Sequence, residues 1–434
     1  MRRRSKARAR VLHPRSHVLL RRAGALLTAI FLLFFLVFAI ALALAPRAPA
    51  TPDAVSSIAE MESFFEDLVA ASHPPGLSVA VVKADDIVYE RSFGLADGPA
   101  GVPASSDTVY RWWSLTKLFT ALAVLQLQEQ GAIGLEDDVR EHLPFIDPTF
   151  RGDPVPPVRV EQLLNHSAGF RNLRFEVLRW THPADATGPS ADERLMESFE
   201  RYQRLRAPPG RRGYYSNYGY FLLGALIEKA SGQSYENYVR ERILDPLAMR
   251  QTDFEVTESM RGHIATGCHP LIDFQTIFLP ATGNLDAYVR EFSKGRFWLD
   301  PFHLDANAYG GAMGTVADAA NFLRAFLQQG RLNGRPVLSP ETVRKMLEDG
   351  WIRAGSSGVA PYSLRRAGMQ HGLGWWVFPA EGGDMYEHTG AGPGFATIMR
   401  LYPEDSLGIV VLANGTSLDR DGIADRLYEL FRTQ

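Results

Sequence analysis

A serine and a lysine three residues apart form the segment of this sequence with the clearest capacity for chemistry. Ser114 lies at the start of an apolar helix that the pattern predicts over 115–130, and Lys117 follows on the same face, one turn further along. A hydroxyl at a helix N-terminus lies at the positive end of the helix dipole, which favours developing negative charge. A lysine buried in such a helix loses its proton easily and can act as a base. The pair therefore predicts a nucleophile with an adjacent base, which acyl transfer requires.

A purely structural interpretation of the same pair stays open. Ser114 could cap the helix, and Lys117 could run along the helix surface to reach water. This spacing alone arises by chance with odds of roughly one in three for a chain of this composition. The placement favours chemistry, because a lysine is costly in an otherwise apolar helix unless it is used.

Two further polar motifs follow later in the chain. Tyr215-Ser216-Asn217 comes after the turn Pro208-Pro209-Gly210 and before an apolar helix predicted over 218–230. His388-Thr389-Gly390 ends a strand-like segment and leads into Ala391-Gly392-Pro393-Gly394. Taken singly, Asn217 could merely cap the next helix and His388 could be an ordinary strand histidine.

Strand-like segments near both ends of the chain must position these motifs. The turn 84–86 makes a hairpin of the first two, and the last ends in the continuous apolar run 407–412, which is typical of a buried strand. The middle of the chain, about 108–350, is mostly helical with long loops. This order predicts an α+β fold whose sheet is assembled from both chain ends, is flanked by helices and has a helical region inserted into it. The predicted strands are 77–83, 87–93, 373–378, 385–389, 395–401 and 407–413, and the clearest further helices are 235–243, 316–328, 340–348 and 419–431.

The N-terminus differs in composition from the rest. Residues 1–22 carry nine Lys or Arg and no acid, and the uncharged run 23–45 spans roughly 34 Å as a helix, enough to cross a bilayer core. We expect 1–22 to be a cytoplasmic tail, 23–45 a transmembrane signal anchor, 46–57 a linker and 58–434 an extracytoplasmic domain. A cleaved signal peptide is the alternative, although its apolar region would be shorter, at about 7–15 residues.

Charge and cysteine content narrow the possible partners. Without the basic tail, the rest of the chain has 37 basic and 49 acidic residues and a net charge of −12. This excess of acidic residues argues against a basic surface that binds nucleic acid. The single cysteine, Cys268, excludes an intramolecular disulfide and is expected to be a small buried or loop residue. No zinc-ligand spacing or glycine-rich phosphate loop is found, so we expect a mechanism without a cofactor.

The ordered set Ser-x-x-Lys, Tyr-x-Asn and His-Thr-Gly resembles the class C β-lactamase and low-molecular-weight penicillin-binding-protein superfamily. A related motif set marks the class A enzymes. The stretches 163–169, 243–249, 310–315 and 371–375 look like the same superfamily, and the resemblance covers about residues 58–432. It implies a β-lactamase/transpeptidase-like fold with an antiparallel sheet.

The resemblance also implies roles for the matching residues. Ser114 would attack a carbonyl and form an acyl-enzyme, while Lys117 and Tyr215 would carry its proton. Tyr215 would also assist the leaving group and deacylation. The backbone N–H groups of Ser114 and Ala391 would form an oxyanion hole, a kind of donor typically worth about 10²–10³ in rate.

The remaining motif residues would then bind substrate. Asn217 would hydrogen-bond the substrate amide and the lysine, and His388 and Thr389 would line the strand along which substrate lies. Gly390 would let substrate approach the backbone closely. His388 replaces the lysine usual in β-lactamases, and His-Thr-Gly resembles D-Ala-D-Ala peptidases, D-amino-acid peptidases and related esterases.

Three hypotheses for the function follow. The leading one is a membrane-anchored serine hydrolase that cleaves an amide or ester, with a peptidase or esterase activity on small-molecule, peptide or peptidoglycan-type substrates favoured over efficient β-lactamase activity. The second is a β-lactam or peptidoglycan sensor that is acylated but turns over slowly. The third is a non-catalytic envelope scaffold, against which the intact three-motif set argues.

Overall fold

The computed structural model describes residues 28–29, 31–33, 35–36, 48–172, 181–183, 203–271, 288–304, 307–355, 368–380 and 382–433. The expected tail 1–22 and most of the expected signal anchor 23–45 lie outside these ranges. The described residues within 23–45 are helical and exposed. Within the described ranges, no helix combines the length and apolar character needed to cross a membrane.

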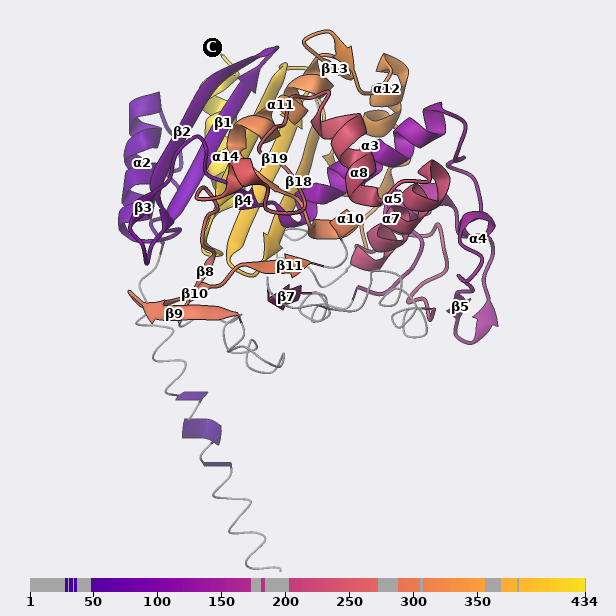
Figure 1. The fold of residues 1–434 in the computed structure, drawn as a ribbon, viewed down its shortest axis with the longest axis horizontal. Coiled ribbons are helices and arrows are strands. Elements are labelled where there is room, and N and C mark those ends of the chain that lie inside the picture. The colour runs from indigo at the N-terminus through magenta and orange to yellow at the C-terminus, as the bar shows by residue number, and fades with distance from the viewer. Residues whose placement is uncertain are drawn as a thin grey trace, which may run out of the picture.

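A nine-stranded antiparallel sheet forms the centre of the molecule, in the order β15-β16-β17-β18-β19-β20-β1-β2-β3 (Figure 1). The first and last long strands of the chain pair directly, with Leu77 opposite Ala413. The prediction of an α+β fold with a sheet built from both chain ends is therefore confirmed. The strands are β1 (Gly76–Lys83), β2 (Asp86–Asp97), β3 (Val102–Pro103), β15 (Ile352–Arg353), β16 (Gln370–His371), β17 (Trp376–Phe378), β18 (Met385–Gly392), β19 (Phe395–Tyr402) and β20 (Leu407–Ala413).

Each face of the sheet is covered by helices because side chains alternate along a strand. On one face, Leu77 and Val79 of β1 pack in a cluster with residues of α2 (Ile58–Ala70) and α14 (Arg420–Phe431). On the other, Ala80 and Val82 belong to the larger core formed with the inserted helical region. Figure 1 shows the helices of that region gathered on the side away from α2.

The inserted region is built around α3 (Thr116–Glu129), whose residues 116–127 are all buried. A helix that is apolar on nearly every side is expected at the centre of a core. The predicted helix 235–243 divides instead into α8 and a π-helical turn, Arg240–Leu244. The other helices are α4 (Val139–His142), α5 (Val160–Leu164), α7 (Asn217–Ser231), α8 (Tyr235–Val239), α10 (Asn307–Gly310), α11 (Val316–Leu327) and α12 (Pro340–Glu348).

Several short strands complete the described fold and were not predicted. A three-stranded sheet runs in the order β8-β10-β9, and two-residue strands β4 and β12 pair beside α3. These strands are β4 (Tyr110–Arg111), β5 (Thr149–Phe150), β6 (Asp153–Pro154), β7 (Thr181–Pro183), β8 (Cys268–Pro270), β9 (Val289–Ser293), β10 (Arg296–Leu299), β11 (Phe302–Leu304), β12 (Met313–Gly314), β13 (Arg331–Leu332) and β14 (Arg335–Pro336).

The predicted linker 46–57 touches the domain where it is described. Thr51 Oγ1 donates a hydrogen bond to Asp419 Oδ2 at 3.0 Å, and Arg426 of α14 donates to the carbonyl oxygen of Asp53. Val55 packs against the cluster beneath α2 and α14. This part of the segment is therefore held against the C-terminal helix.

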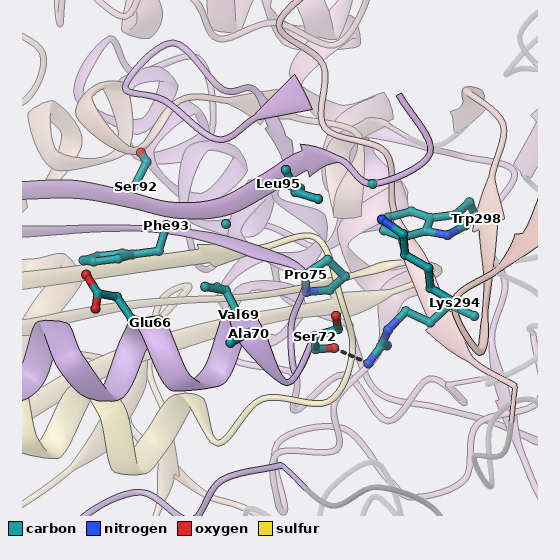
Figure 2. Close-up of a pocket in the computed structure, with 13 residues that line it drawn as sticks. Glu66, Val69, Ala70, Ser72, Pro75, Ser92, Phe93, Leu95, Lys294 and Trp298 are labelled. Atoms are coloured by element: carbon teal, nitrogen blue, oxygen red, sulfur yellow. Dashed lines mark hydrogen bonds between the residues drawn. The ribbon is translucent and has the colours of Figure 1, made fainter. Parts of the chain in front are cut away.

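A cavity of about 480 Å³ opens between α2, β2 and the β9–β10 turn (Figure 2). Its walls are mixed, with Phe93 and Leu95 on one side and Lys294 and Trp298 on another. None of the residues predicted to be catalytic lines it. This cavity therefore does not mark the position of the predicted catalytic residues.

Candidate active site

The residue predicted to be the nucleophile lies in a tight turn. Ser114 is the middle residue of a 3₁₀ turn, Trp113–Leu115, that joins β4 to α3, and its side chain is partly exposed. Trp113 has a φ of 50°, an unfavourable left-handed conformation for a bulky residue. Backbone strain of this kind persists only where surrounding contacts enforce it.

Contacts from the segment 312–314 enforce the turn. The backbone N–H of Trp112 donates to the carbonyl of Ala312 at 2.9 Å, and its indole Nε1 donates to the carbonyl of Gly314 at 3.0 Å. Thr116 Oγ1 donates to the carbonyl of Trp113 at 2.6 Å and accepts the N–H of Ala312 at 3.1 Å. Both flanks of Ser114 are thereby fixed.

Lys117 lies directly beneath Ser114 and is fully buried. Its Nζ is 3.1 Å from Ser114 Oγ and donates to the carbonyl of Tyr309 at 2.6 Å. No carboxylate of the described residues forms an ion pair with it. Burial therefore lowers the pKa of Lys117 well below its usual value. A neutral amine that donates one N–H to Tyr309 keeps a lone pair for the proton of Ser114.

Tyr215 approaches the nucleophile from the other side. Its phenol donates to Ser114 Oγ at 2.7 Å, and its ring centroid is 5.0 Å from Lys117 Nζ. Burial raises the pKa of Tyr215 above its usual value, and the bond to Ser114 opposes this only in part. The phenol therefore stays protonated as a donor, and the structure brings together the predicted triad Ser114, Lys117 and Tyr215.

Asn217 lies near the triad without joining it. It is the first residue of α7, whose cap is Ser216. Its Oδ1 is buried with no hydrogen-bond partner among the described residues, and no hydrogen bond links it to Lys117. The amide oxygen is thus available to a substrate, while the bond to the lysine that the resemblance implies is made by the carbonyl of Tyr309 instead.

The other wall of the site is the edge of β18. The neighbouring strand β17 pairs only with residues 385–387, so beyond Glu387 no described strand covers this edge. The turn that carries Ser114 packs against β18 there, and Ala391 is exposed at the strand end. Gly390 is needed for this approach, because a Cβ at that position would lie 2.0 Å from the carbonyl oxygen of Trp112. The Cβ side of Gly390 is thus occupied by the nucleophile turn.

His388 and Thr389 are both buried. The Nδ1 of His388 is 3.0 Å from the carbonyl of Thr389, and its ring stands 6.2 Å from that of Tyr215. Burial lowers the pKa of His388 well below its usual value. The imidazole is therefore neutral and lies next to Tyr215. Of residues 388–389, only the backbone lies at the free edge of β18.

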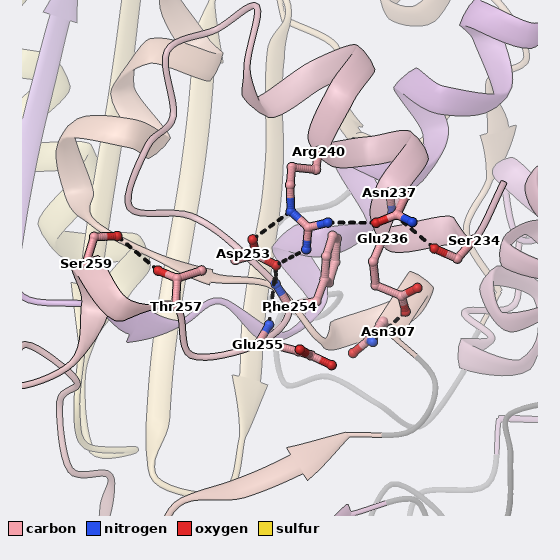
Figure 3. A network of polar contacts seen from close by, with 10 residues as sticks. All are labelled: Ser234, Glu236, Asn237, Arg240, Asp253, Phe254, Glu255, Thr257, Ser259 and Asn307. Atoms are coloured by element: carbon pink, nitrogen blue, oxygen red, sulfur yellow. Dashed lines mark hydrogen bonds and ion pairs between the residues drawn. The ribbon is translucent and has the colours of Figure 1, made fainter.

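Sequence reasoning did not single out the supports shown in Figure 3. Arg240 forms a bidentate ion pair with Asp253 at 2.8 and 2.9 Å, and Asp253 pairs with Met313 beside the nucleophile turn. Asn307 donates to Glu236 at 2.6 Å, which anchors the short helix α10 that presents the carbonyl of Tyr309. The sequence signals for this region were the predicted helix 235–243 and the stretches 243–249 and 310–315, none of which identified these contacts.

A family model described as Beta-lactamase matches residues 61–433, nearly the whole described domain. The chain belongs to the Beta-lactamase family. The family's members are serine hydrolases, a group that includes penicillin-binding proteins, β-lactamases and amidases. The resemblance seen in the three motifs is thereby confirmed at the level of the family.

Individual relatives agree with this assignment. Penicillin-binding protein 4* of Bacillus subtilis is 27% identical over 363 residues, which cover 82% of this chain and 71% of that protein. Protein flp of Staphylococcus aureus is 26% identical over 82% of this chain, which spans only 62% of that relative's length.

Solved structures share the fold. An octameric penicillin-binding protein homologue from Pyrococcus abyssi aligns with a TM-score of 0.68 and 28% identity over 86% of this chain and 77% of its own. D-amino acid amidase from Ochrobactrum anthropi, solved with L-phenylalanine amide, has a TM-score of 0.68 at 21% identity, over 86% of this chain and 98% of its own.

Proposed function

We propose that this protein hydrolyses an amide or ester bond through an acyl-enzyme formed on Ser114. The observation that carries the proposal is the contact of one hydroxyl oxygen with two proton carriers, Lys117 Nζ at 3.1 Å and Tyr215 Oη at 2.7 Å. Burial favours the neutral form of both groups, so the lysine can accept a proton and the phenol can donate one.

The proposed reaction has two balanced steps. Ser114 Oγ attacks the carbonyl carbon as its proton passes to Lys117 Nζ, and the leaving amine or alcohol departs with a proton delivered through Tyr215. Water then attacks the acyl-serine and gives up a proton to the same pair, which returns a proton to Ser114 Oγ as the acyl bond breaks and the acid is released. The backbone N–H groups of Ser114 and Ala391 are the proposed donors to the carbonyl oxygen.

The proposed substrate is a peptide or peptidoglycan-type acyl compound. Asn217 supports this choice, because its unpartnered Oδ1 can accept a hydrogen bond from a substrate amide. His388 is neutral and buried, so it offers no fixed cation where β-lactamases usually have lysine. We therefore favour peptidase or esterase activity over efficient β-lactamase activity.

Active-site labelling tests the proposal. A fluorophosphonate probe and a fluorescent penicillin are each incubated with the wild type, with Ser114→Ala and with Ser63→Ala, a matched control on the exposed surface of α2. We expect the wild type and the Ser63 variant to be labelled and the Ser114 variant to stay unlabelled. Equal labelling of Ser114→Ala and the wild type, or no labelling of the wild type by either probe, would falsify the proposal.

Turnover separates the hydrolase from a slow-turnover sensor. We expect steady hydrolysis of at least one member of a panel of D-Ala-D-Ala peptides, nitrophenyl esters and a chromogenic cephalosporin. A single burst of one equivalent per protein, with no steady phase on any of them, would instead assign the sensor role.

We also propose that residues 23–45 anchor the domain to a membrane with the active site on the extracytoplasmic side. The support is the uncharged run behind nine basic residues. Intact-mass measurement of protein extracted from membranes is the test. Retention of the first 50 residues is expected, and loss of about the first 45–50 would indicate a cleaved signal peptide.

A further inference from the structure

A buried histidine outside the three motifs lies directly under Tyr215. His166 follows α5, is 4% exposed and has a φ of 61°. Its ring centroid is 4.5 Å from that of Tyr215 and 5.0 Å from that of Tyr220. It makes no hydrogen bond with Ser114 or Lys117 in the described structure, and its contact with the predicted triad is through Tyr215.

The backbone on both sides of Tyr215 hydrogen-bonds to this one residue. The N–H of Tyr214 donates to the carbonyl of His166 at 2.7 Å. The N–H of Ser216 donates to the Nδ1 of the His166 imidazole at 3.2 Å. The residues before and after Tyr215 are thus both hydrogen-bonded to His166, and the His166 ring contacts the Tyr215 ring whose phenol donates to Ser114.

The contact to Ser216 fixes the chemical form of the imidazole. An Nδ1 that accepts a hydrogen bond carries no proton, so the ring proton is on Nε2. Burial lowers the pKa of His166 well below its usual value, which agrees with a neutral ring. A protonated ring would turn an N–H toward the N–H of Ser216.

We propose that His166 is the positioning residue for Tyr215, holding the phenol at hydrogen-bond distance from Ser114 through the Nδ1 acceptor and the left-handed backbone. The inference rests on the proposed function for its catalytic consequence, but its geometric content stands without it. The ring contacts of Tyr215 with Trp376 and His388, at 6.1 and 6.2 Å, are longer and carry no hydrogen bond. These contacts limit the tilt of the Tyr215 ring, but they do not fix the position of the backbone at residues 214–216.

Three substitutions at position 166 distinguish the effect of the hydrogen-bond acceptor from the effect of side-chain volume. His166→Asn keeps an acceptor at the position of Nδ1, and Asn tolerates the left-handed conformation well. His166→Gln moves the acceptor one carbon further out, and His166→Leu keeps apolar volume without an acceptor. His371→Leu is the control, because His371 is also buried, 5.0 Å from His166, but hydrogen-bonds neither flank of Tyr215.

Crystal structures of the folded variants test the geometric content without reference to activity. We expect the distance from Tyr215 Oη to Ser114 Oγ to stay near 2.7 Å in His166→Asn and in His371→Leu. We expect the phenol to leave hydrogen-bond distance in His166→Leu and His166→Gln. If His166→Leu does not fold, the comparison of His166→Asn with His166→Gln decides whether His166 positions the phenol. A phenol that stays in place in the glutamine variant, or leaves it in the asparagine variant, overturns the proposal.

Acylation kinetics test the catalytic consequence. For variants labelled by the fluorophosphonate probe, we expect the maximal acylation rate of His166→Leu and His166→Gln to fall about 10²-fold, since misplacement by about 1 Å costs that much. The probe concentration at half-maximal rate should not change, and His166→Asn should recover most of the rate. A wild type that is never labelled would contradict the proposed function, while the distances measured in the crystals would still decide the role of His166.

Discussion

The protonation state of one buried lysine determines whether the proposed chemistry is possible. Lys117 pays the desolvation cost of burial without a carboxylate partner among the described residues. Three tyrosine rings lie 5.0–5.4 Å from its Nζ and would favour the charged form, a contribution of about 0.5–2 kcal/mol each. Desolvation outweighs them, so the pKa of Lys117 lies well below its usual value.

A neutral Lys117 makes the acylation rate depend on pH in a defined direction. The base is active when unprotonated, so the rate falls as the pH drops through the lowered pKa of Lys117. We expect the rate to reach its plateau well below pH 10.5, the ordinary pKa of lysine. Labelling rates measured across pH check this, and a rate still rising through pH 10.5 would contradict it.

Replacing the lysine by a permanent cation should remove the base. In Lys117→Arg the guanidinium stays protonated at every accessible pH, so we expect acylation to slow by about 10²–10⁴-fold. Lys83→Arg is the matched control, because Lys83 only donates to carbonyls near the C-terminus. A rate in Lys117→Arg within a few-fold of the control would exclude the lysine as base.

At the scale of elements, the site depends on how closely the nucleophile turn approaches β18. A methyl group at position 390 would lie 2.0 Å from the carbonyl oxygen of Trp112 and 2.3 Å from Thr397 Oγ1. Neither atom belongs to a flexible side-chain end, because Thr397 Oγ1 itself donates to the same carbonyl at 3.0 Å. The turn and the strand would have to separate.

Gly390→Ala should therefore damage both stability and activity. We expect a loss of about 1–3 kcal/mol in the free energy of unfolding, as for an overpacked core, and at least a tenfold slower acylation. Gly219→Ala, in the first turn of α7, is the control, since its methyl group would make ordinary contacts of 3.7–3.8 Å. Urea unfolding and labelling rates measure the two effects. Equal behaviour of the two variants would show that the approach at Gly390 is not required.

Sequence patterns predicted the long elements well because continuous apolar segments report directly on burial. The fully buried strand β20 and the all-round apolar α3 are examples. The same reasoning placed Ser114 and Lys117, and the resemblance to the superfamily added Tyr215. Neither could find the carbonyl of Tyr309, since a backbone acceptor leaves no trace in residue type. It assigned Gly390 to substrate approach, because a glycine shows that something comes close and does not show what.

At the scale of the whole molecule, the C-terminal helix fastens the catalytic strand to the sheet. Arg420 of α14 donates to the carbonyl of Gly390. Arg400 of β19, which is fully buried, donates to Glu387 of β18 at 2.5 Å and to two aspartates of α14 at 2.6 and 3.0 Å. Burial alone would lower the pKa of Arg400, but the attraction of these carboxylates outweighs it and raises that pKa. The last element of the chain thus holds β18, which lies three elements before it in the sequence.

Neutralising one partner of this buried cluster should destabilise the fold and loosen the site together. Glu387 is 1% exposed and precedes His388, so Glu387→Gln leaves Arg400 under-compensated next to the strand edge. We expect a loss of about 3 kcal/mol in the free energy of unfolding, the low end for a broken buried pair, because two aspartates remain. Glu429→Gln removes the same charge from the exposed end of a pair with Arg426 on α14 and should cost at most about 1 kcal/mol. Urea midpoints that shift equally in the two variants would mean that the buried cluster does not hold β18 to α14.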